Sequence, residues 1–188
     1  GKVDGMQEER DLITDYAAFI DYHQSRGTSK GSLSHILTLQ THLEQFTKRQ
    51  RFTLTYYNIN LEFYGKFRRY LQEYEHRDGQ TYGENSVGNF IKKLKMFLNW
   101  AKGNGWNPYD FYHHPEFQIP EKQVDNVYLE QSELNSIAAL DLNKRPYLND
   151  TRNWFFLACE TGMRYSDYHQ LRKANLKEVP NGYDYTFL

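Results

Sequence analysis

The fold is decided most clearly by residues 85–102, which read Asn85-Ser86-Val87-Gly88-Asn89-Phe90-Ile91-Lys92-Lys93-Leu94-Lys95-Met96-Phe97-Leu98-Asn99-Trp100-Ala101-Lys102. Apolar side chains recur every three or four positions and form one stripe of a helix: Val87, Phe90, Ile91, Leu94, Phe97, Leu98 and Ala101. The opposite face carries amides and amines, with Lys93 beside them: Asn85, Asn89, Lys92, Lys95, Asn99 and Lys102. Gly103 then favours a stop. The stretch predicts an amphipathic helix with a polar, basic outer face.

Three more helices are predicted before this one. Residues 8–26 and 30–49 carry apolar residues at helical spacing, and Gly27 lies between them as a stop signal. Residues 51–57 are rich in β-formers and predict an extended connection. A third helix then runs from Asn58 or Asn60 to the turn signal at Asp78-Gly79. Residues 1–106 are therefore expected to form an all-α domain of four to five helices.

Prolines change the character of the chain after residue 106. Pro108, Pro115 and Pro120 lie within a short stretch, and proline breaks helices and favours extended backbone before it. We therefore expect an interdomain linker over residues 107–126. Beyond it, periodicity predicts helices over 131–140, 147–160 and 164–172, and residues 183–188 have the composition of a strand.

Composition excludes several classes of protein. The 188 residues hold 23 Lys and Arg against 24 Asp and Glu, yet residues 44–108 hold 11 basic and 6 acidic side chains, a net charge of +5. This basic middle can attract a polyanion, although charge alone favours an ordinary solvated helix face. A single cysteine, Cys159, excludes a disulfide framework and a multi-cysteine zinc site, and it lies on an apolar helix face as an expected small core residue. No metal site is predicted at His113-His114, beside Pro115.

Neither a membrane-spanning segment nor a signal peptide is indicated. The apolar runs are short, and residues 1–10 are polar and acidic. We expect a soluble protein of the cytoplasm that does not bind a membrane.

The stretch most informative about chemistry is residues 153–167. An apolar helix leads into Thr161-Gly162, and Arg164 follows at the first turn of the next helix. The glycine permits a tight bend, and a guanidinium held on such a support suits bidentate capture of a phosphate. Asp167 can brace the helix start or the guanidinium. The alternative is a plain helix–turn–helix corner with a surface arginine, and spacing alone does not separate the two.

Three stretches, in this order, resemble the tyrosine recombinase (phage integrase) family. Residues 161–167, Thr-Gly-Met-Arg-Tyr-Ser-Asp, resemble the box around the first catalytic arginine of that family. Residues 127–134 resemble the entry into its catalytic domain, and residues 85–105 resemble the last long helix of its core-binding domain. The character is that of integrases from Bacteroidetes mobile elements. The resemblance covers residues 11–188.

The resemblance implies a fold and a function. The fold is a SAM-like helical bundle over 1–106, followed over 127–188 by the truncated helical beginning of an α+β catalytic domain. Members carry out site-specific recombination and integration of double-stranded DNA, cleaving it with a tyrosine nucleophile that forms a 3′-phosphotyrosyl intermediate. They use no metal or other cofactor. By this resemblance Arg164 binds the scissile phosphate and Asp167 supports it.

The resemblance also implies that catalytic parts are missing from these residues. The family's lysine, second arginine box and tyrosine nucleophile are expected after Leu188. His169-Gln170-Leu171-Arg172 matches the His-x-x-Arg pattern, but it lies too close to Arg164 to be the second box. We therefore expect a fragment that does not cleave DNA alone. It is expected to be a monomer in solution, whereas the full-length protein would form a tetramer on DNA.

DNA contacts are expected from the second and fourth helices, as in the family's core-binding domain. On the fourth helix the first choices are Lys92, Lys95 and Asn89, with Lys93 and Asn99 on the same face. On the second helix the candidates are Ser34, His35, Thr38, His42 and Arg49. Amines suit phosphates, and amides suit base edges.

Two other functions fit the same helices. One is a non-enzymatic DNA-binding regulator or accessory factor that uses the same clamp. The other is a helical protein-interaction module whose basic row only aids solubility. Salt-dependent binding to duplex DNA is expected of the recombinase and of the DNA-binding regulator, and it separates both from the protein-interaction module.

Overall fold

The structure is a computed structural model, and it describes residues 10–185 except 52, 77, 126 and 181. The chain divides into two compact units, Gly1–Val124 and Asp125–Leu188. The first unit contains four α-helices: α1 (Leu12–Ser25), α2 (Lys30–Gln50), α3 (Leu61–Gln72) and α4 (Glu84–Gly103). This confirms the predicted helical bundle.

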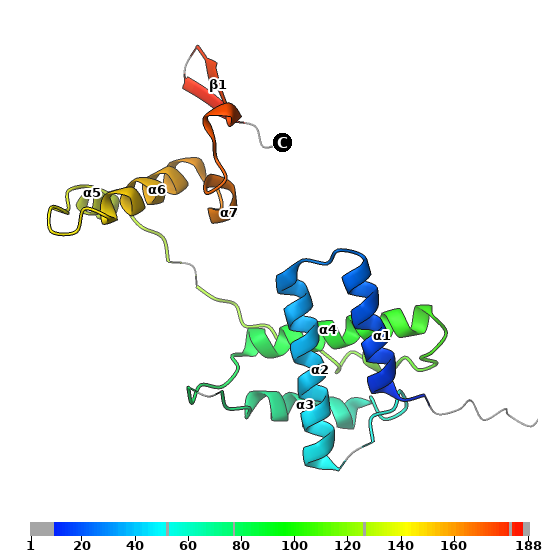
Figure 1. Ribbon diagram of the computed structural model, residues 1–188. Coiled ribbons are helices and arrows are strands. Elements are labelled where there is room, and N and C mark those ends of the chain that lie inside the picture. The colour runs from blue at the N-terminus through cyan, green and yellow to red at the C-terminus, as the bar shows by residue number, and fades with distance from the viewer. Residues whose placement is uncertain (1–9, 52, 77, 126, 181, 186–188) are drawn as a thin grey trace, which may run out of the picture. The chain divides into compact units, whose positions relative to one another are not determined.

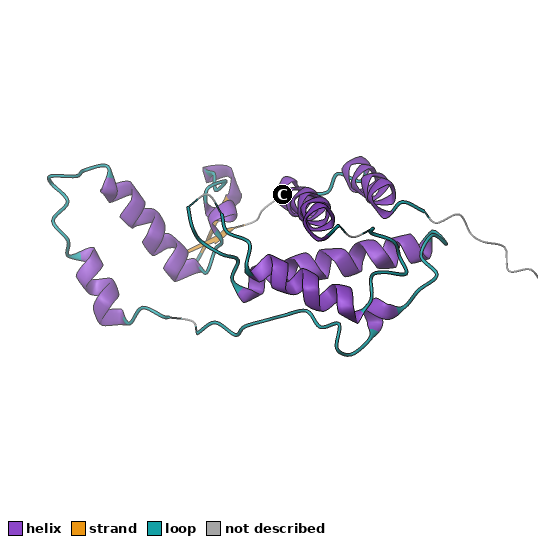
Figure 2. Cartoon of the chain, turned by 90° about the horizontal axis from the view of Figure 1, so that it is seen from below, coloured by secondary structure: helices purple, strands orange, loops and turns teal. Residues whose placement is uncertain are grey.

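The four helices form two crossed layers. α1 and α2 lie side by side and cross α3 and α4, as the two views show (Figures 1 and 2). Large apolar side chains from all four helices fill the space between the layers and are almost completely buried, among them Tyr16, Phe19, Leu39, Phe46, Phe67 and Phe97. Many of these rings meet edge to face: Phe46 contacts Phe67 at a centroid distance of 5.3 Å. An aromatic core therefore holds the bundle together.

Side chains set the helix starts. The carboxylate of Asp11 accepts hydrogen bonds from the backbone N–H groups of Ile13 and Thr14, so α1 begins at Leu12. Residues 8 and 9 of the predicted helix lie outside the described residues. Asn60 caps α3 in the same way through Phe63 N–H at 3.1 Å. Ser29 caps α2 by accepting from Ser32 N–H.

The buried carboxylate of Asp15 ties the start of α1 to the segment before α3. Asp15 is only 4 % exposed, and its carboxylate accepts two hydrogen bonds from the Arg10 guanidinium, at 2.9 and 2.7 Å. The Tyr56 hydroxyl donates a third, at 2.8 Å. The Arg10 guanidinium also lies 4.4 Å from the centre of the Trp106 ring. The carboxylate is thus satisfied from several sides, as a buried charge requires.

The segment for which the prolines predict a linker packs onto α4 instead of leaving the bundle. Residues 107–124, named here the strap, contain the short 3₁₀-helix η1 (Phe111–His113) and belong to the first unit. Tyr112, Phe117 and Pro120 of the strap are buried. Figure 2 shows this loop running along the helices of the first unit.

The second unit is smaller. It contains α5 (Gln131–Ala138), α6 (Leu148–Thr161), α7 (Tyr165–Tyr168), η2 (Lys173–Asn175) and an antiparallel hairpin of β1 (Leu176–Val179) with β2 (Gly182–Tyr185). Arg152 on α6 donates to the carbonyl oxygens of Ala138 and Leu140, which ties α6 to the end of α5. None of this unit's described residues is buried. Cys159 is exposed, so its predicted core position is wrong.

Candidate nucleic-acid interface

The polar face of α4 is divided by the strap. Asn89 and Lys92 are exposed, and Lys93 is half-buried. Lys93 lies toward His23 of α1. Burial of His23 is the main cause that lowers its pKa, and the positive charge of Lys93 is the second cause. These three side chains lie within about four residues of one another and keep their nitrogen atoms available on one stretch of helix.

Lys95, which is half-buried, and Asn99, which is exposed, both contact the strap. The ammonium of Lys95 lies 5.4 Å from the centre of the Phe117 ring, and burial lowers the pKa of Lys95. The side-chain oxygen of Asn99 accepts a hydrogen bond from the Tyr112 hydroxyl at 3.1 Å. Lys102, at the end of the same face, pairs with Asp110 of the strap. The strap therefore engages three of the polar side chains of α4 that the sequence predicts as DNA contacts or as their neighbours on the same face.

On α2, the candidates in the N-terminal half lie at the surface. Ser34 and His35 are exposed, and Thr38 is half-buried. The Thr38 hydroxyl donates to the Ser34 carbonyl oxygen at 2.8 Å, within the helix. α2 and α4 pack against each other, with the His42 and Phe90 rings 5.0 Å apart. Ser34 and His35 therefore stand on a helix that is in contact with α4.

His42 is a core residue and not the surface contact expected from the sequence. It is 2 % exposed and lies among Tyr70, Tyr74, Tyr82 and Phe90. Burial lowers the pKa of His42 to about 4, and the positive charge of His76 adds to the effect. A neutral, buried imidazole does not contact a phosphate.

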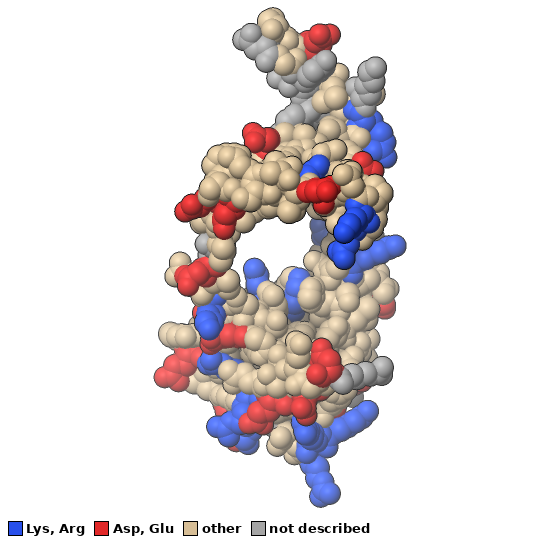
Figure 3. Space-filling model, turned by 90° about the vertical axis from the view of Figure 1, so that its left-hand side faces the viewer, with Lys and Arg blue, Asp and Glu red and all other residues tan. Residues whose placement is uncertain are grey.

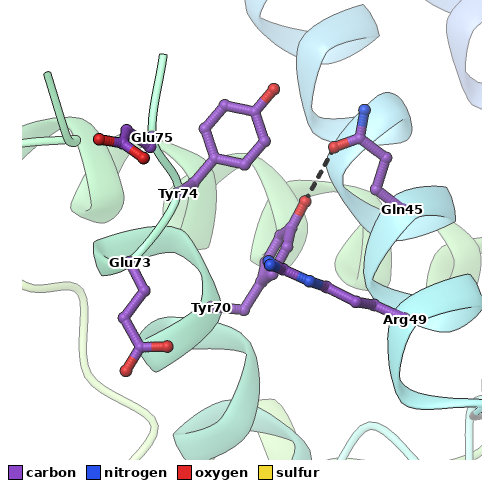
Figure 4. Close-up of a pocket in the computed structure, with 6 residues that line it drawn as sticks. All are labelled: Gln45, Arg49, Tyr70, Glu73, Tyr74 and Glu75. Atoms are coloured by element: carbon purple, nitrogen blue, oxygen red, sulfur yellow. Dashed lines mark hydrogen bonds between the residues drawn. The ribbon is translucent and has the colours of Figure 1, made fainter. Parts of the chain in front are cut away.

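Arg49 lies apart from the other candidates. It is fourteen residues after His35 on the same helix, a distance of about 21 Å at 1.5 Å per residue. Its guanidinium lies 6.0 Å from the centre of the Tyr70 ring, beside a hollow of about 430 Å³ (Figure 4). The hollow is lined by Gln45, Arg49, Tyr70, Glu73, Tyr74 and Glu75. Two glutamates in this lining weaken the attraction of a phosphate. Arg49 is therefore not part of the surface formed by Asn89, Lys92 and Lys93, named here the α4 row.

Charge on the first unit is mixed. On the face seen in Figure 3, Lys and Arg side chains occur next to Asp and Glu. Part of the basic excess is paired: Lys66 with Glu62 at 2.6 Å, and Arg68 with Glu84 at 3.3 Å. The α4 row is thus a local feature of the surface.

The arginine box has the geometry that its glycine predicts. Gly162 ends α6 with φ +66°, a left-handed conformation that glycine adopts without strain. The Thr161 hydroxyl donates to the Leu157 carbonyl oxygen at 2.6 Å and accepts from Met163 N–H at 3.3 Å, which fixes the bend. Arg164 follows as the residue that caps α7, and its side chain is exposed.

Asp167 lies in the first turn of α7. Its carboxylate accepts from the Ser166 hydroxyl at 3.0 Å, and its N–H donates to the Arg164 carbonyl oxygen. Within the described chain no ion pair joins the side chains of Arg164 and Asp167. Arg172 of the His-x-x-Arg pattern donates to the carbonyl oxygens of His169 and Leu171. The hydrogen bond of the Asp167 carboxylate is thus local to α7, and Arg164 is exposed.

The strap is the part of the site that the sequence did not reveal. Proline spacing indicated a linker, while the buried anchors Tyr112 and Phe117 follow neither a helical nor a strand period. The one signal was Gly88, a glycine in the middle of an otherwise regular helix, where it costs stability relative to alanine and so points to a packing reason.

Among the described residues, no cluster of three or more His, Cys, Asp or Glu side chains could hold a metal ion. No helix in the described part of the chain is long and apolar enough to cross a membrane.

Comparison with known proteins identifies the first unit. The model of one protein family, described as the phage integrase SAM-like domain, matches residues 12–119, from the start of α1 into the strap. Searches of curated proteins and of solved structures found no match. The matched region covers more than half of the chain and supports the resemblance seen in the sequence. The chain therefore belongs to the phage integrase (tyrosine recombinase) family, with the SAM-like domain at its N-terminal end.

Proposed function

We propose that the first unit binds duplex DNA through Asn89, Lys92 and Lys93 of α4, together with Ser34 and His35 of α2. The SAM-like domain implies DNA binding and site-specific recombination as the activity of the family. The observation that carries the residue assignment is the division of α4: the strap engages Lys95 and Asn99, and leaves the nitrogens of the other three accessible. Amines on one turn suit adjacent phosphates, and the Asn89 amide can read a base edge.

Binding of the whole chain to random duplex DNA across a salt series tests this proposal. We expect Lys92→Ala/Lys93→Ala to weaken binding and to reduce the slope of log affinity against log salt by about 1.8, because each phosphate contact contributes about 0.9. Lys48→Ala/Lys66→Ala removes the same charge from α2 and α3 and serves as the matched control. Equal losses in both double variants would show that only net charge matters and would refute the assignment.

For the second unit we propose that Arg164 binds the phosphate at which the strand is cleaved. The support is geometric: a left-handed glycine and the Thr161 hydroxyl fix the bend, and an exposed guanidinium follows directly. Such a planar, permanently charged group can donate two parallel hydrogen bonds to one phosphate. Asp167 supports this turn through its carboxylate, which accepts a hydrogen bond from the Ser166 hydroxyl in the same short helix.

The conservative variant tests the bidentate role. We expect Arg164→Lys to lose affinity for DNA nearly as much as Arg164→Ala, because an ammonium does not reproduce the fork. Full retention of binding in Arg164→Lys would mean that only the charge acts. Since these 188 residues carry no second box and no tyrosine in a nucleophile context, we expect them to bind DNA without cleaving it.

A further inference from the structure

The last part of the strap is held to α4 by a single asparagine side chain. Asn85 donates from Nδ2 to the Lys122 carbonyl oxygen at 3.0 Å and accepts from Lys122 N–H at 2.7 Å through Oδ1. One amide therefore satisfies both backbone groups of one residue, as a neighbouring β-strand would. After Lys122, residues 123–125 are exposed. The ordered contact between strap and helix thus ends at this bond pair.

Gly88 lets the strap come this close. A Cβ atom at position 88 would lie 1.9 Å from the carbonyl oxygen of Pro120 and 3.1 Å from its carbonyl carbon, distances that the backbone does not allow. Glycine destabilises the middle of a helix relative to alanine, so its presence here is explained by the strap and not by α4 itself. Gly65 in α3 has open space around it, with no atom within 4 Å of an added Cβ.

These contacts lie outside the core that the strap completes. Phe117 is completely buried, and the centre of its ring lies 4.6 Å from the centre of the Tyr64 ring. Tyr112 is 2 % exposed. Beyond Phe117, the strap buries only Pro120 before it reaches Lys122. Loss of the Asn85 bonds would therefore free residues 118–124 without opening the bundle.

We propose that Asn85 and Gly88 form a latch, and that this latch sets the length of free chain between the DNA-binding unit and Arg164. With the latch closed, eight residues, 123–130, separate Lys122 from α5 and span at most about 28 Å. When the latch is open and the chain is free as far back as Phe117, thirteen residues, 118–130, separate Phe117 from α5 and span at most about 45 Å. Asn85 and Gly88 are thus positioning residues, and this role rests on the proposed function of the two units.

The consequence for DNA binding follows from effective concentration. When the first unit is bound, a shorter tether confines Arg164 to a smaller volume around the same duplex. Effective concentration falls with roughly the three-halves power of tether length, so opening the latch should weaken two-unit binding by about two-fold. Binding by the first unit alone should not change.

Trypsin tests the latch without DNA. Asn85 binds the carbonyl group of the Lys122–Gln123 peptide bond, so we expect Asn85→Ala and Gly88→Ala to raise cleavage after Lys122 by about five-fold or more. Cleavage after Lys144, in the loop between α5 and α6, should stay the same in every variant. Gly65→Ala is the matched control for Gly88→Ala. Unchanged cleavage at Lys122 in Asn85→Ala, which alters only an exposed side chain, would overturn the latch.

A double-mutant cycle on DNA tests the positioning role. We expect Gly88→Ala to weaken binding of the whole chain to a 40-base-pair duplex by about two-fold, and to have no effect in the Arg164→Ala background. An equal loss in both backgrounds, or no loss while cleavage at Lys122 rises, would refute positioning. If the wild-type chain bound no DNA at all, the proposed function would fail while the trypsin result would still decide the latch.

Discussion

Nε2 of His42 on α2 lies 2.9 Å from the hydroxyl oxygen of Tyr82, in the loop that precedes α4. The other ring nitrogen, Nδ1, lies 3.3 Å from the Tyr70 hydroxyl of α3, which itself donates to Gln45 at 3.1 Å. Tyr70 therefore accepts from Nδ1–H, and Nε2 accepts from Tyr82. The neutral imidazole satisfies both nitrogens and joins α2, α3 and the loop before α4.

This contact predicts that the protein loses stability in mild acid. The pKa of His42 is about 4 in the folded protein and about 6.5 in an unfolded chain, so the neutral form is favoured by folding. The contribution of neutral His42 to the free energy of unfolding is complete above pH 6.5 and is lost as the pH falls toward 4. Between pH 7 and pH 5 we expect a loss of about 2 kcal/mol in the free energy of unfolding.

Urea unfolding at several pH values checks this expectation. His42→Gln removes the titrating group and should flatten the decline between pH 6.5 and 4.5. His35→Gln removes an exposed histidine from the same helix and should leave the decline as it is. A wild-type slope that survives in His42→Gln would assign the acid sensitivity to other groups.

The carboxylate of Asp15 gives the second prediction. Tyr56→Phe removes one hydrogen bond to a buried charge that keeps its Arg10 partner, and should cost about 1.5–3 kcal/mol. The neighbouring Tyr57 is 59 % exposed, so Tyr57→Phe should cost less than about 0.5 kcal/mol. Chemical denaturation of both variants at pH 7 measures the difference, and equal stabilities would show that the hydroxyl of Tyr56 contributes nothing to holding α1.

The third prediction concerns the strap as part of the first unit's core. Phe117→Ala should destabilise the unit by about 3–5 kcal/mol, because it empties a completely buried ring site against Tyr64. Ile119→Ala, two residues later, removes a side chain that is 43 % exposed and should cost much less. Thermal unfolding followed by circular dichroism compares them. A strap that acted as a free linker would give two small, equal effects.

The sequence predicted the helices well because each carries a long apolar period. α4 was expected over 85–102 and spans Glu84–Gly103, since the stripe from Val87 to Ala101 leaves little freedom in its position. α7 was expected over 164–172 and spans only Tyr165–Tyr168, where the chain then turns through the Arg172 contacts. Helix ends depend on local capping and are less well determined by the periodicity.

The candidate site was predicted less well because its limits are set by tertiary contacts. His42 lies on the helix face expected to be polar, and only the convergence of Tyr70 and Tyr82 from distant parts of the chain makes that face buried. Lys95 falls in the same row as Lys92 by spacing, and only the strap separates them. Both differences arise from segments whose path over the bundle has no periodic signal.

The last prediction compares these two lysines on DNA. Lys92→Ala should weaken binding and lower the salt slope by about 0.9, whereas Lys95→Ala should change the slope by much less, because its ammonium rests over the Phe117 ring. Fluorescence anisotropy with one labelled duplex at four salt concentrations measures both slopes. Lys48→Ala controls for the loss of one positive charge.

A large effect of Lys95→Ala would have a specific meaning. The ammonium would then have left the Phe117 ring, either because the lysine side chain rotates or because the strap moves away from α4 on the DNA. Movement of the strap would also expose Lys122 to trypsin in the complex but not in the free protein. Protection of Lys122 in both states, together with a small effect of Lys95→Ala, is the result expected from a strap that stays on the helix while Lys92 contacts DNA.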